Sequence, residues 1–279
     1  MGGLSDEQLN FYKEEGYLLI EDVLPPDVFA PLIAEIERDI DWKAREAQTE
    51  GRLEDLFEDE PFARRLARIC AALEGEVDSF WSFTGDKYKS EGMFAVMTHP
   101  AILDIVESVI GPEILAHPQF NLRAKLPGQE ITVVPWHQDL AYLMREAEDT
   151  FLVNFWIPLV DATAENGCME VIASSHRGEL IQHDRIGIYK GILDENLPPG
   201  ERITCPLRVG GVLLTRHKIA HRSIPNTSDH IRWSLDLRYS DPALPTGRAY
   251  VPGFIARSKA DPQSVARGLE DWLKRMEAA

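Results

Sequence analysis

The chain has 279 residues, of which 44% are hydrophobic and 27% are charged, a composition typical of a globular protein with a large buried core. Acidic residues outnumber basic ones by 46 to 29, which gives a formal net charge of −17. Because this charge repels polyanions, we expect neither a nucleic acid nor an anionic membrane as a partner, while the oligomeric state stays unknown.

The N-terminal sequence predicts a cytoplasmic protein. Residues 1–8 are polar and acidic and lack the apolar stretch of a signal peptide, and no apolar run in the chain reaches the length of a bilayer span. The three cysteines, Cys70, Cys168 and Cys205, are widely separated. We interpret them as buried thiols, because their spacing suits neither a disulfide framework nor a cysteine metal site.

The first part of the chain is predicted to be mainly helical. Ser5 with Gln8 three positions later has the pattern of a capping box, and Gly16 ends this short helix before an apolar strand over 17–20. Pro25 and the residue after it begin a long helix. Its apolar stripe follows helical spacing and consists of Val28, Leu32, Ile33, Ile36 and Ile40. Further helices are expected over 60–74 and 98–110.

From about residue 114 the sequence changes to short alternating segments separated by turn residues, which predicts a β sandwich or barrel. In 119–125 and 232–238 the polar side chains share one face and the apolar ones the other. A surface strand shows the same pattern, but two such strands near candidate ligands favour a polar interior. Residues 178–200 are predicted to be an insert or lid between strands.

His137 and Asp139 are two positions apart, so on an extended segment both side chains leave by the same face. A facial triad of two histidines and one carboxylate binds iron(II) on one side and leaves positions open for other ligands. The third ligand would come from a later strand. His221 is favoured over His217, because Arg232 follows His221 by eleven residues and can form a bidentate pair with a carboxylate.

Four segments of the chain resemble the phytanoyl-CoA dioxygenase family of iron(II)- and 2-oxoglutarate-dependent oxygenases. They are FYKEEGYLLIEDVL at 11–24, WHQD at 136–139, NGCMEVI followed by SSHR within 166–177, and HRSIPN with Arg232 at 221–232. One departure is Ala173, directly before SSHR, where the family has a proline. We expect this change to alter a turn and not the metal site.

The resemblance covers nearly the whole chain and implies its fold. It implies a mainly β protein with a double-stranded β-helix core (jelly-roll, cupin-like) supported by N-terminal helices. It also implies a single oxygenase domain over 1–279. The expected parts are a helical part over about 1–112, a core over about 113–245, and a C-terminal tail and helix over 246–279.

The resemblance also implies the cofactors and the residues that bind them. His137, Asp139 and His221 would be the catalytic metal ligands for iron(II). The co-substrates would be 2-oxoglutarate and O₂, with succinate and CO₂ as products. The residues expected to contact 2-oxoglutarate are Arg232, Ser223, Trp156 and Asn121, with Gln119 or Arg123 in place of Asn121 if the strand register differs by one pleat.

The presence of Asp139 favours hydroxylation, because halogenating relatives replace this acid with a small residue to admit chloride. We expect a small or medium-sized organic metabolite as substrate, since no Lys/Arg cluster meets the phosphates of a coenzyme A ester. Two alternatives are a jelly-roll metalloenzyme that does not use 2-oxoglutarate and a catalytically silent binding protein. Lys87 and Tyr88 are weaker candidates for the pocket mouth, and Asp236 and Arg238 could contact substrate or form internal ion pairs.

Overall fold

The computed structural model describes residues 2–73, 88–248 and 251–277. The helices are α1 (Asp6–Glu15), α2 (Ala30–Thr49), α3 (Phe62–Ala72), α5 (Glu91–Met97), α6 (Pro100–Ile110) and α7 (Leu269–Glu277). The strands are β1 (Tyr17–Ile20), β2 (Ile114–Ala116), β3 (Asn121–Lys125), β4 (Val153–Pro158), β5 (Met169–Ile172), β6 (Asp184–Ile186), β7 (Tyr189–Gly191), β8 (Arg202–Cys205), β9 (Val212–Arg216), β10 (His221–Ser223), β11 (Arg232–Ser240) and β12 (Phe254–Arg257).

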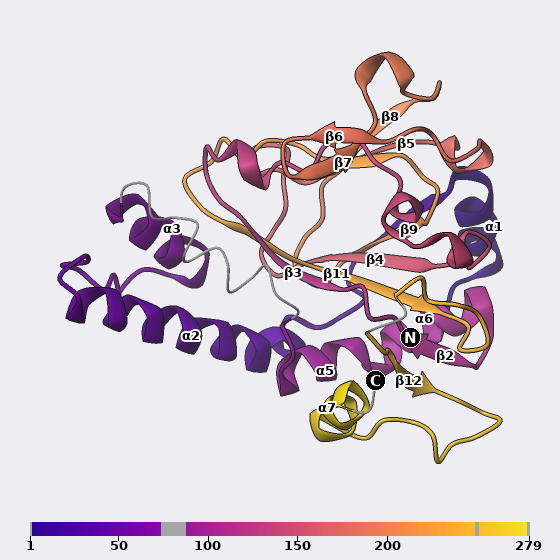
Figure 1. The fold of residues 1–279 in the computed structure, drawn as a ribbon, viewed down its shortest axis with the longest axis horizontal. Coiled ribbons are helices and arrows are strands. Elements are labelled where there is room, and N and C mark those ends of the chain that lie inside the picture. Colours follow the sequence, from indigo (N-terminus) through magenta and orange to yellow (C-terminus); the bar gives the residue numbers. More distant parts are fainter. Residues whose placement is uncertain (1, 74–87, 249–250, 278–279) are drawn as a thin grey trace.

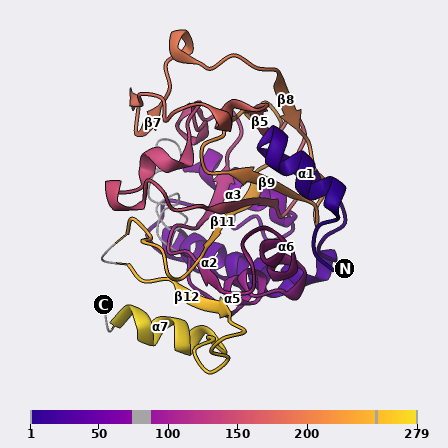
Figure 2. The same cartoon turned by 90° about the vertical axis from the view of Figure 1, so that its right-hand side faces the viewer.

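The core has two antiparallel sheets. The larger one runs β1-β9-β4-β11-β2-β12, with β3 also paired to β11, and the smaller one runs β10-β5-β8. Figure 1 shows the smaller sheet above the larger one and the helices α2, α5 and α6 below it, and Figure 2 shows the same three layers from the side. This arrangement is the predicted jelly-roll with N-terminal helical support, although the two sheets do not close into a barrel in the described residues.

The long helix and its neighbours follow the sequence pattern closely. In α1, Ser5 and Gln8 make both hydrogen bonds of the capping box, and Gly16 ends the helix at φ 81°. Leu32, Ile36 and other residues at helical spacing in α2 are buried against the sheet. The sequence missed α5, which is only seven residues long and packs so closely on α2 that Gly92 has no room for a side chain beside the backbone of α2.

Strand β11 separates the hydrophobic core from the polar interior. Its odd-numbered residues, from Trp233 to Tyr239, are buried in the core between the larger sheet and the helices. Of its even-numbered residues, Arg232, Asp236 and Arg238 line a cavity, and Ser234 accepts a hydrogen bond from Arg232. The alternation predicted for 232–238 therefore places a row of polar side chains inside the protein.

The C-terminal helix α7 packs against the same core. Trp272 contacts Phe94 of α5, Phe120 and Phe254 of β12 through ring centroids 5.1 to 6.4 Å apart. The three cysteines are buried and free, as predicted.

The insert over 178–200 contains the β6–β7 hairpin, which forms a separate two-stranded sheet. Among the described residues no single helix is long and apolar enough to cross a membrane. Only together do α5 and α6 reach the length and apolar composition of a membrane span, and this pair is bent by 42°.

Candidate active site

His137 and His221 lie directly opposite each other in an antiparallel bridge. The backbone N–H of His137 donates to the carbonyl of His221 at 2.9 Å, and the reverse bond measures 3.0 Å. Opposite residues of such a pair project their side chains to the same face. The expected regular strand is absent, since only this bridge forms and Asp139 begins a short 3-10 helix. The backbone of Gln138, between the two ligands, is still extended, so the predicted convergence holds.

The backbone also fixes the orientation of both imidazoles. Nδ1 of His137 lies 2.8 Å from the carbonyl of Pro135, and Nδ1 of His221 lies 3.1 Å from that of Ile219. A carbonyl accepts only a hydrogen, so each ring carries its proton on Nδ1 and directs the lone pair of Nε2 toward Asp139. Each Nε2 lies 3.9 Å from an oxygen of Asp139.

The potential ligand atoms of His137, Asp139 and His221 lie within 4.8 Å of one another, and all three residues are buried. Two imidazole lone pairs and one carboxylate at this separation suit a single divalent ion. Burial and the nearby His221 lower the pKa of His137 to about 3, so its imidazole is neutral at pH 7, the state that binds a metal.

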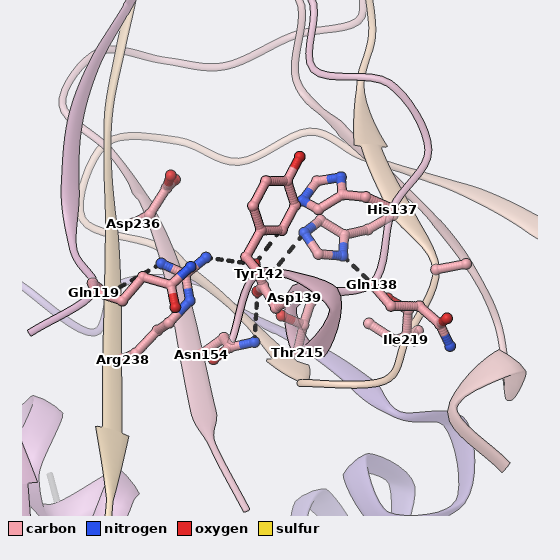
Figure 3. Close-up of polar contacts among 12 residues, drawn as sticks. Gln119, His137, Gln138, Asp139, Tyr142, Asn154, Thr215, Ile219, Asp236 and Arg238 are labelled. Carbon is pink, nitrogen blue, oxygen red and sulfur yellow. Dashed lines mark hydrogen bonds and ion pairs between the residues drawn. The ribbon is translucent and has the colours of Figure 1, made fainter. Parts of the chain in front are cut away.

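Asp139 is held by two neighbouring side chains from the larger sheet. Arg238 of β11 donates to Oδ1 at 2.5 Å, and Asn154 of β4 donates to Oδ2 at 2.7 Å, as Figure 3 shows. Burial raises the pKa of this carboxyl, but the charge of the neighbouring Arg238 is the largest of the effects that outweigh burial and hold the pKa below its usual range. The carboxylate is therefore ionised and oriented by the protein alone.

His217, the alternative third ligand, points elsewhere. Its Nδ1 accepts a hydrogen bond from the backbone N–H of Leu152 at 3.3 Å, and its ring packs edge-on against Phe151. It is not part of the group of potential ligands. The geometry therefore favours His221 over His217.

Arg232 lies at the other end of the cavity and is buried. Its Nε donates to the carbonyl of Gly167 at 3.1 Å, a second nitrogen donates to Ser234, and its guanidinium lies 5.1 Å from the ring centroid of Trp156. Burial lowers the pKa of Arg232 to about 10, so it stays charged at pH 7. In the described part of the chain no carboxylate pairs with Arg232.

Lys125 is directly opposite Arg232 in the β3–β11 register. Its Nζ donates to Oγ of Ser223 at 2.9 Å and to the carbonyl of Thr132 at 3.0 Å. Burial, and then the charges of Arg232 and Arg123, lower the pKa of Lys125 to about 6. Oγ of Ser223 also accepts from the backbone N–H of Val134, so its own hydrogen remains to be donated.

Gly167 brings these groups together. Its φ is 90°, and a side chain there would lie 2.4 Å from Cε of Lys125. The sequence suggests that Asn166 and Gly167 form a hairpin turn, but β4 and β5 do not pair. The turn instead carries the chain from the larger sheet to the smaller one.

Asn121 faces the same cavity but has a partner of its own. Its amide donates to Oδ2 of Asp236 at 3.3 Å, and Arg123 donates to the same oxygen at 2.5 Å. Asp236 and Arg238 thus both form internal ion pairs, the second of the two roles expected for them. All of the residues expected to bind the metal or 2-oxoglutarate line one cavity, whose volume is about 250 Å³.

The insert contributes Tyr189 to the lining of this cavity. Tyr142 and Tyr189 line it, and their hydroxyls donate to the carbonyls of Lys190 and Ile131 at 2.7 and 2.9 Å. Gln138, between the two ligands His137 and Asp139, accepts from the backbone N–H of Ile181 at 2.8 Å. These bonds tie the predicted lid to the metal site. Lys87 lies outside the described residues, and Tyr88 instead donates to Asp39 of α2 at 2.6 Å.

Sequence reasoning missed several residues that hold the site. Asn154 and Arg238, which orient Asp139, were not singled out for that role, and Lys125 was seen only as part of a polar strand face. The signal for Lys125 and Arg238 was present, since each continues the alternation that contains a predicted site residue. For Asn154 the signal was weaker, because β4 is buried on both faces.

Comparisons with known proteins agree with this geometry. The family model for phytanoyl-CoA dioxygenase matches residues 12–234. Peroxisomal phytanoyl-CoA dioxygenase of Rattus norvegicus is 25% identical over 244 residues, which cover 85% of this chain and 68% of that protein. Phytanoyl-CoA dioxygenase domain-containing protein 1 of the same species is 28% identical over 285 residues and covers 91% of this chain and 94% of that protein.

Solved structures share the fold. The non-haem monooxygenase ThoJ has a TM-score of 0.59 at 19% identity and covers 97% of this chain and 96% of its own. The epimerase SnoN, solved with Fe³⁺, alpha-ketoglutarate and nogalamycin RO, has a TM-score of 0.55 at 21% identity and covers 94% of this chain and 93% of its own. Since the family model matches most of the sequence, the chain belongs to the phytanoyl-CoA dioxygenase family.

Proposed function

We propose that this protein is an iron(II)- and 2-oxoglutarate-dependent dioxygenase that hydroxylates a small or medium-sized organic metabolite. One observation carries the proposal. The His137, Asp139 and His221 group lines the same cavity as the guanidinium of Arg232, which pairs with no carboxylate in the described ranges 2–73, 88–248 and 251–277. A metal site alone would suit many enzymes, but an Arg clamp within the same cavity suits a carboxylate that also reaches the metal.

Iron(II) fits the donor set. The two Nε2 lone pairs and the carboxylate are directed toward a common point, and the hydrogen bonds of their far atoms are already satisfied. Such bonds fix ligand orientation and make the ligands more basic. When bound, iron(II) with 2-oxoglutarate and O₂ supplies the oxidising chemistry, in which 2-oxoglutarate is converted to succinate and CO₂.

The residues around Arg232 fit the distal carboxylate of 2-oxoglutarate. Arg232 supplies the charge, the hydroxyl of Ser223 supplies a donor, and Trp156 supports the guanidinium from one side. Lys125 adds a second potential cation beside Ser223. Asn121 stays a proposed contact of lower rank, because its amide is engaged with Asp236.

The protein also excludes water and positions the substrate. The cavity volume of about 250 Å³ lies below the roughly 300–1,000 Å³ of most ligand pockets, so it has room for only part of a large substrate beside the co-substrate. Tyr142 and Tyr189 line the cavity and are anchored through their hydroxyls, and we expect them to shield reactive species from solvent. The Asp139 carboxylate supports hydroxylation, because it leaves no ligand position for a halide at that point.

We also propose that 1–279 works as a single domain. The tail helix α7 supports this idea, since Trp272 packs on Phe94 from the helical part and Phe120 from the core.

The test is to incubate the purified protein with iron(II), ascorbate and labelled 2-oxoglutarate and to measure succinate. We expect metal-dependent succinate formation, with a Michaelis constant for 2-oxoglutarate that rises about 10- to 100-fold in Arg232→Ala, because a charged bidentate bond is lost. Arg145→Ala is the matched control, since the side chain of Arg145 is 93% exposed.

The outcome separates this proposal from its rivals. A jelly-roll metalloenzyme that does not use 2-oxoglutarate would bind the metal but form no succinate. A silent binding protein would form no succinate under any addition of substrate. An unchanged Michaelis constant in Arg232→Ala would show that 2-oxoglutarate is bound elsewhere.

A further inference from the structure

The charges that line the cavity do not balance. The charged arginines are Arg123, Arg232, Arg238 and Arg248, and the carboxylates are Asp139 and Asp236. Among the described residues that line the cavity, four arginines against two carboxylates leave an excess of two positive charges, in a chain whose net charge is −17. Charges removed from water are costly unless paired, so the cavity favours anions.

The ion pairs show which arginines carry the excess positive charge. Arg123 pairs with Asp236 at 2.5 Å, and Arg238 pairs with Asp139 at 2.5 Å. This leaves Arg232 and Arg248. The proposed function, on which this inference rests, assigns Arg232 to the distal carboxylate of 2-oxoglutarate, so Arg248 remains without a counter-charge among the residues that the structure describes.

The surroundings of Arg248 also lack hydrogen-bond partners. Its Nε is buried and makes no hydrogen bond to any residue that the structure describes, and the same holds for Oε1 of Gln119 and Nε of Arg238. Gln119 and Arg238 are 7% and 5% exposed, so water does not readily satisfy these atoms. Burial and the neighbouring Arg238 lower the pKa of Arg248 from its ordinary value, but a guanidinium stays charged at pH 7.

A buried histidine holds this end of the cavity together. Nδ1 of His117 accepts from the backbone N–H of Gln119 at 3.1 Å, and its Nε2 lies 2.9 Å from the carbonyl of Thr246. Because Nδ1 is an acceptor, Nε2 carries the hydrogen and donates it. His117 therefore links the segment of Arg248 to that of Gln119.

Gly247 allows the same segment to pack closely against 144–147. Its carbonyl accepts from the backbone N–H of Met144 at 3.3 Å, and a side chain on Gly247 would lie 2.9 Å from Cβ of Ala147. Arg248 is thus presented to the cavity by a segment anchored on two sides. Figure 3 shows Gln119 and Arg238 side by side next to Asp139.

We propose that Gln119, Arg238 and Arg248 form a subsite for a carboxylate group of the primary substrate. Arg248 supplies the counter-charge through its planar guanidinium, which matches a carboxylate. The amide of Gln119 can turn its NH₂ group toward the same anion. Since Arg238 also holds Asp139, the bound carboxylate lies beside the metal site, and the carbon to be oxidised lies within a few bonds of it.

Acetate is a suitable probe, because it is the smallest molecule that carries the proposed group. The protein is loaded with iron(II) and saturating 2-oxoglutarate without O₂, and relaxation of the acetate methyl protons by the paramagnetic iron is measured during a titration. We expect saturable enhancement that is about 10- to 100-fold weaker in affinity in Arg248→Ala, the loss expected for one charged hydrogen-bonded pair. Gln119→Glu should also weaken binding, because it places a like charge at the subsite.

Controls separate the possible results. Arg145→Ala removes an exposed arginine and should bind acetate as the unmodified protein does. Neutral acetamide should show no saturation. Equal acetate affinity in Arg248→Ala would overturn the subsite, and tighter binding of inorganic phosphate than of acetate would overturn the choice of a carboxylate. Arg248→Gln keeps the test valid if Arg248→Ala does not fold.

A second measurement uses turnover. Succinate formation is measured with each member of a set of carboxylic acids, and with the matching primary amides, added as candidate substrates. We expect stimulation by acids and not by the matching amides, with a Michaelis constant for the acid that rises at least tenfold in Arg248→Ala while that for 2-oxoglutarate is unchanged. Stimulation by the amides alone overturns the inference, whereas absence of 2-oxoglutarate binding overturns the proposed function first.

Discussion

The two ends of the cavity differ in how their charges are balanced. At the metal end, Asp139 is paired with Arg238, and the imidazole of His137 is oriented by a backbone carbonyl. At the other end, Arg232 and Lys125 lie opposite each other, and no carboxylate among the described residues pairs with either. The metal end is therefore complete as a set of ligands, whereas the other end is completed only when an anion binds.

This difference indicates two kinds of preorganisation. At the metal end the protein fixes ligand direction with hydrogen bonds, so little reorganisation accompanies metal binding. At the other end the guanidinium of Arg232 and the amine of Lys125 are held by Gly167 and Ser223, and the electrostatic cost of charging both groups is one that a dicarboxylate would relieve. Mutations at the two ends should consequently have different signatures, one in metal affinity and one in co-substrate affinity.

The largest effect is expected from Asp139→Ala. Loss of an anionic ligand weakens iron binding and leaves Arg238 buried without its partner, so hydroxylation should fall to background. The measurement is iron content together with succinate formed without added substrate. His217→Gln is the control and should keep its iron, because His217 bonds to Leu152 instead. Full iron occupancy in Asp139→Ala would show that the carboxylate is not a ligand.

Arg238→Met tests how Asp139 is oriented at the metal end, because it removes the residue that positions this carboxylate and leaves all three ligands in place. Without Arg238, Oδ1 of Asp139 loses its 2.5 Å partner, and we expect iron affinity to fall by about 10- to 100-fold. A competition titration with a chelator measures this change. Arg123→Met breaks the other ion pair of similar length and should leave iron affinity unchanged. Similar losses in both variants would point to general destabilisation of the cavity.

Gly167→Ala disturbs the Arg232 end of the cavity without removing a charge. The residue has φ 90°, and a methyl group would lie 2.4 Å from Cε of Lys125 and 2.7 Å from the carbonyl of Ile224. We expect a loss of about 1–3 kcal/mol in the free energy of unfolding, measured with denaturant, and weaker binding of 2-oxoglutarate. Gly51→Ala has a similar φ of 73° with no atom within 4 Å, so it isolates the backbone cost. Equal losses in the two variants would show that the close contacts at Gly167 add nothing to the backbone cost.

The sequence predicted the metal end better than the other end, for a physical reason. Local spacing places His137 and Asp139 on one face, and a strand pairing brings His221 opposite them. Strand alternation likewise predicted the polar face of β11. Alternation cannot say which polar side chains pair with each other, because that depends on the β3–β11 register, which puts Lys125 beside Arg232.

Other features had only a weak local signal or none. The regular strand expected around His137 is reduced to a bridge, because the 3-10 turn at Asp139 interrupts the ladder. The short α5 has a good N-cap in Ser90 but too few residues for a periodic pattern. Asn154 lies on a strand buried on both faces, where polar and apolar positions do not alternate clearly.

The smallest expected effect is a pH dependence that arises from Lys125. Its pKa of about 6 leaves the amine mostly neutral at pH 7.5, and a bound dicarboxylate would raise that pKa and draw in a proton. Below pH 6 the amine is already charged, so 2-oxoglutarate affinity should be level there and should fall by up to about tenfold per pH unit above pH 6. The same shift acts on folding, because unfolded Lys125 keeps its proton up to about pH 10, so stability of the unliganded protein should rise between pH 6 and 10.

Calorimetry measures the proton directly. Binding of 2-oxoglutarate to the iron(II) protein without O₂ is titrated at pH 7.5 in two buffers of different ionisation enthalpy, and the difference in heat gives the protons taken up. We expect an uptake close to one, which disappears in Lys125→Met, whereas Lys190→Met at the surface should behave as the unmodified protein does. Uptake that persists in Lys125→Met would mean that another group accepts the proton. Absence of uptake in the unmodified protein would mean that Lys125 is already charged, and the contrast between the paired ligand Asp139 and an anion-dependent clamp would then rest on Arg232 alone.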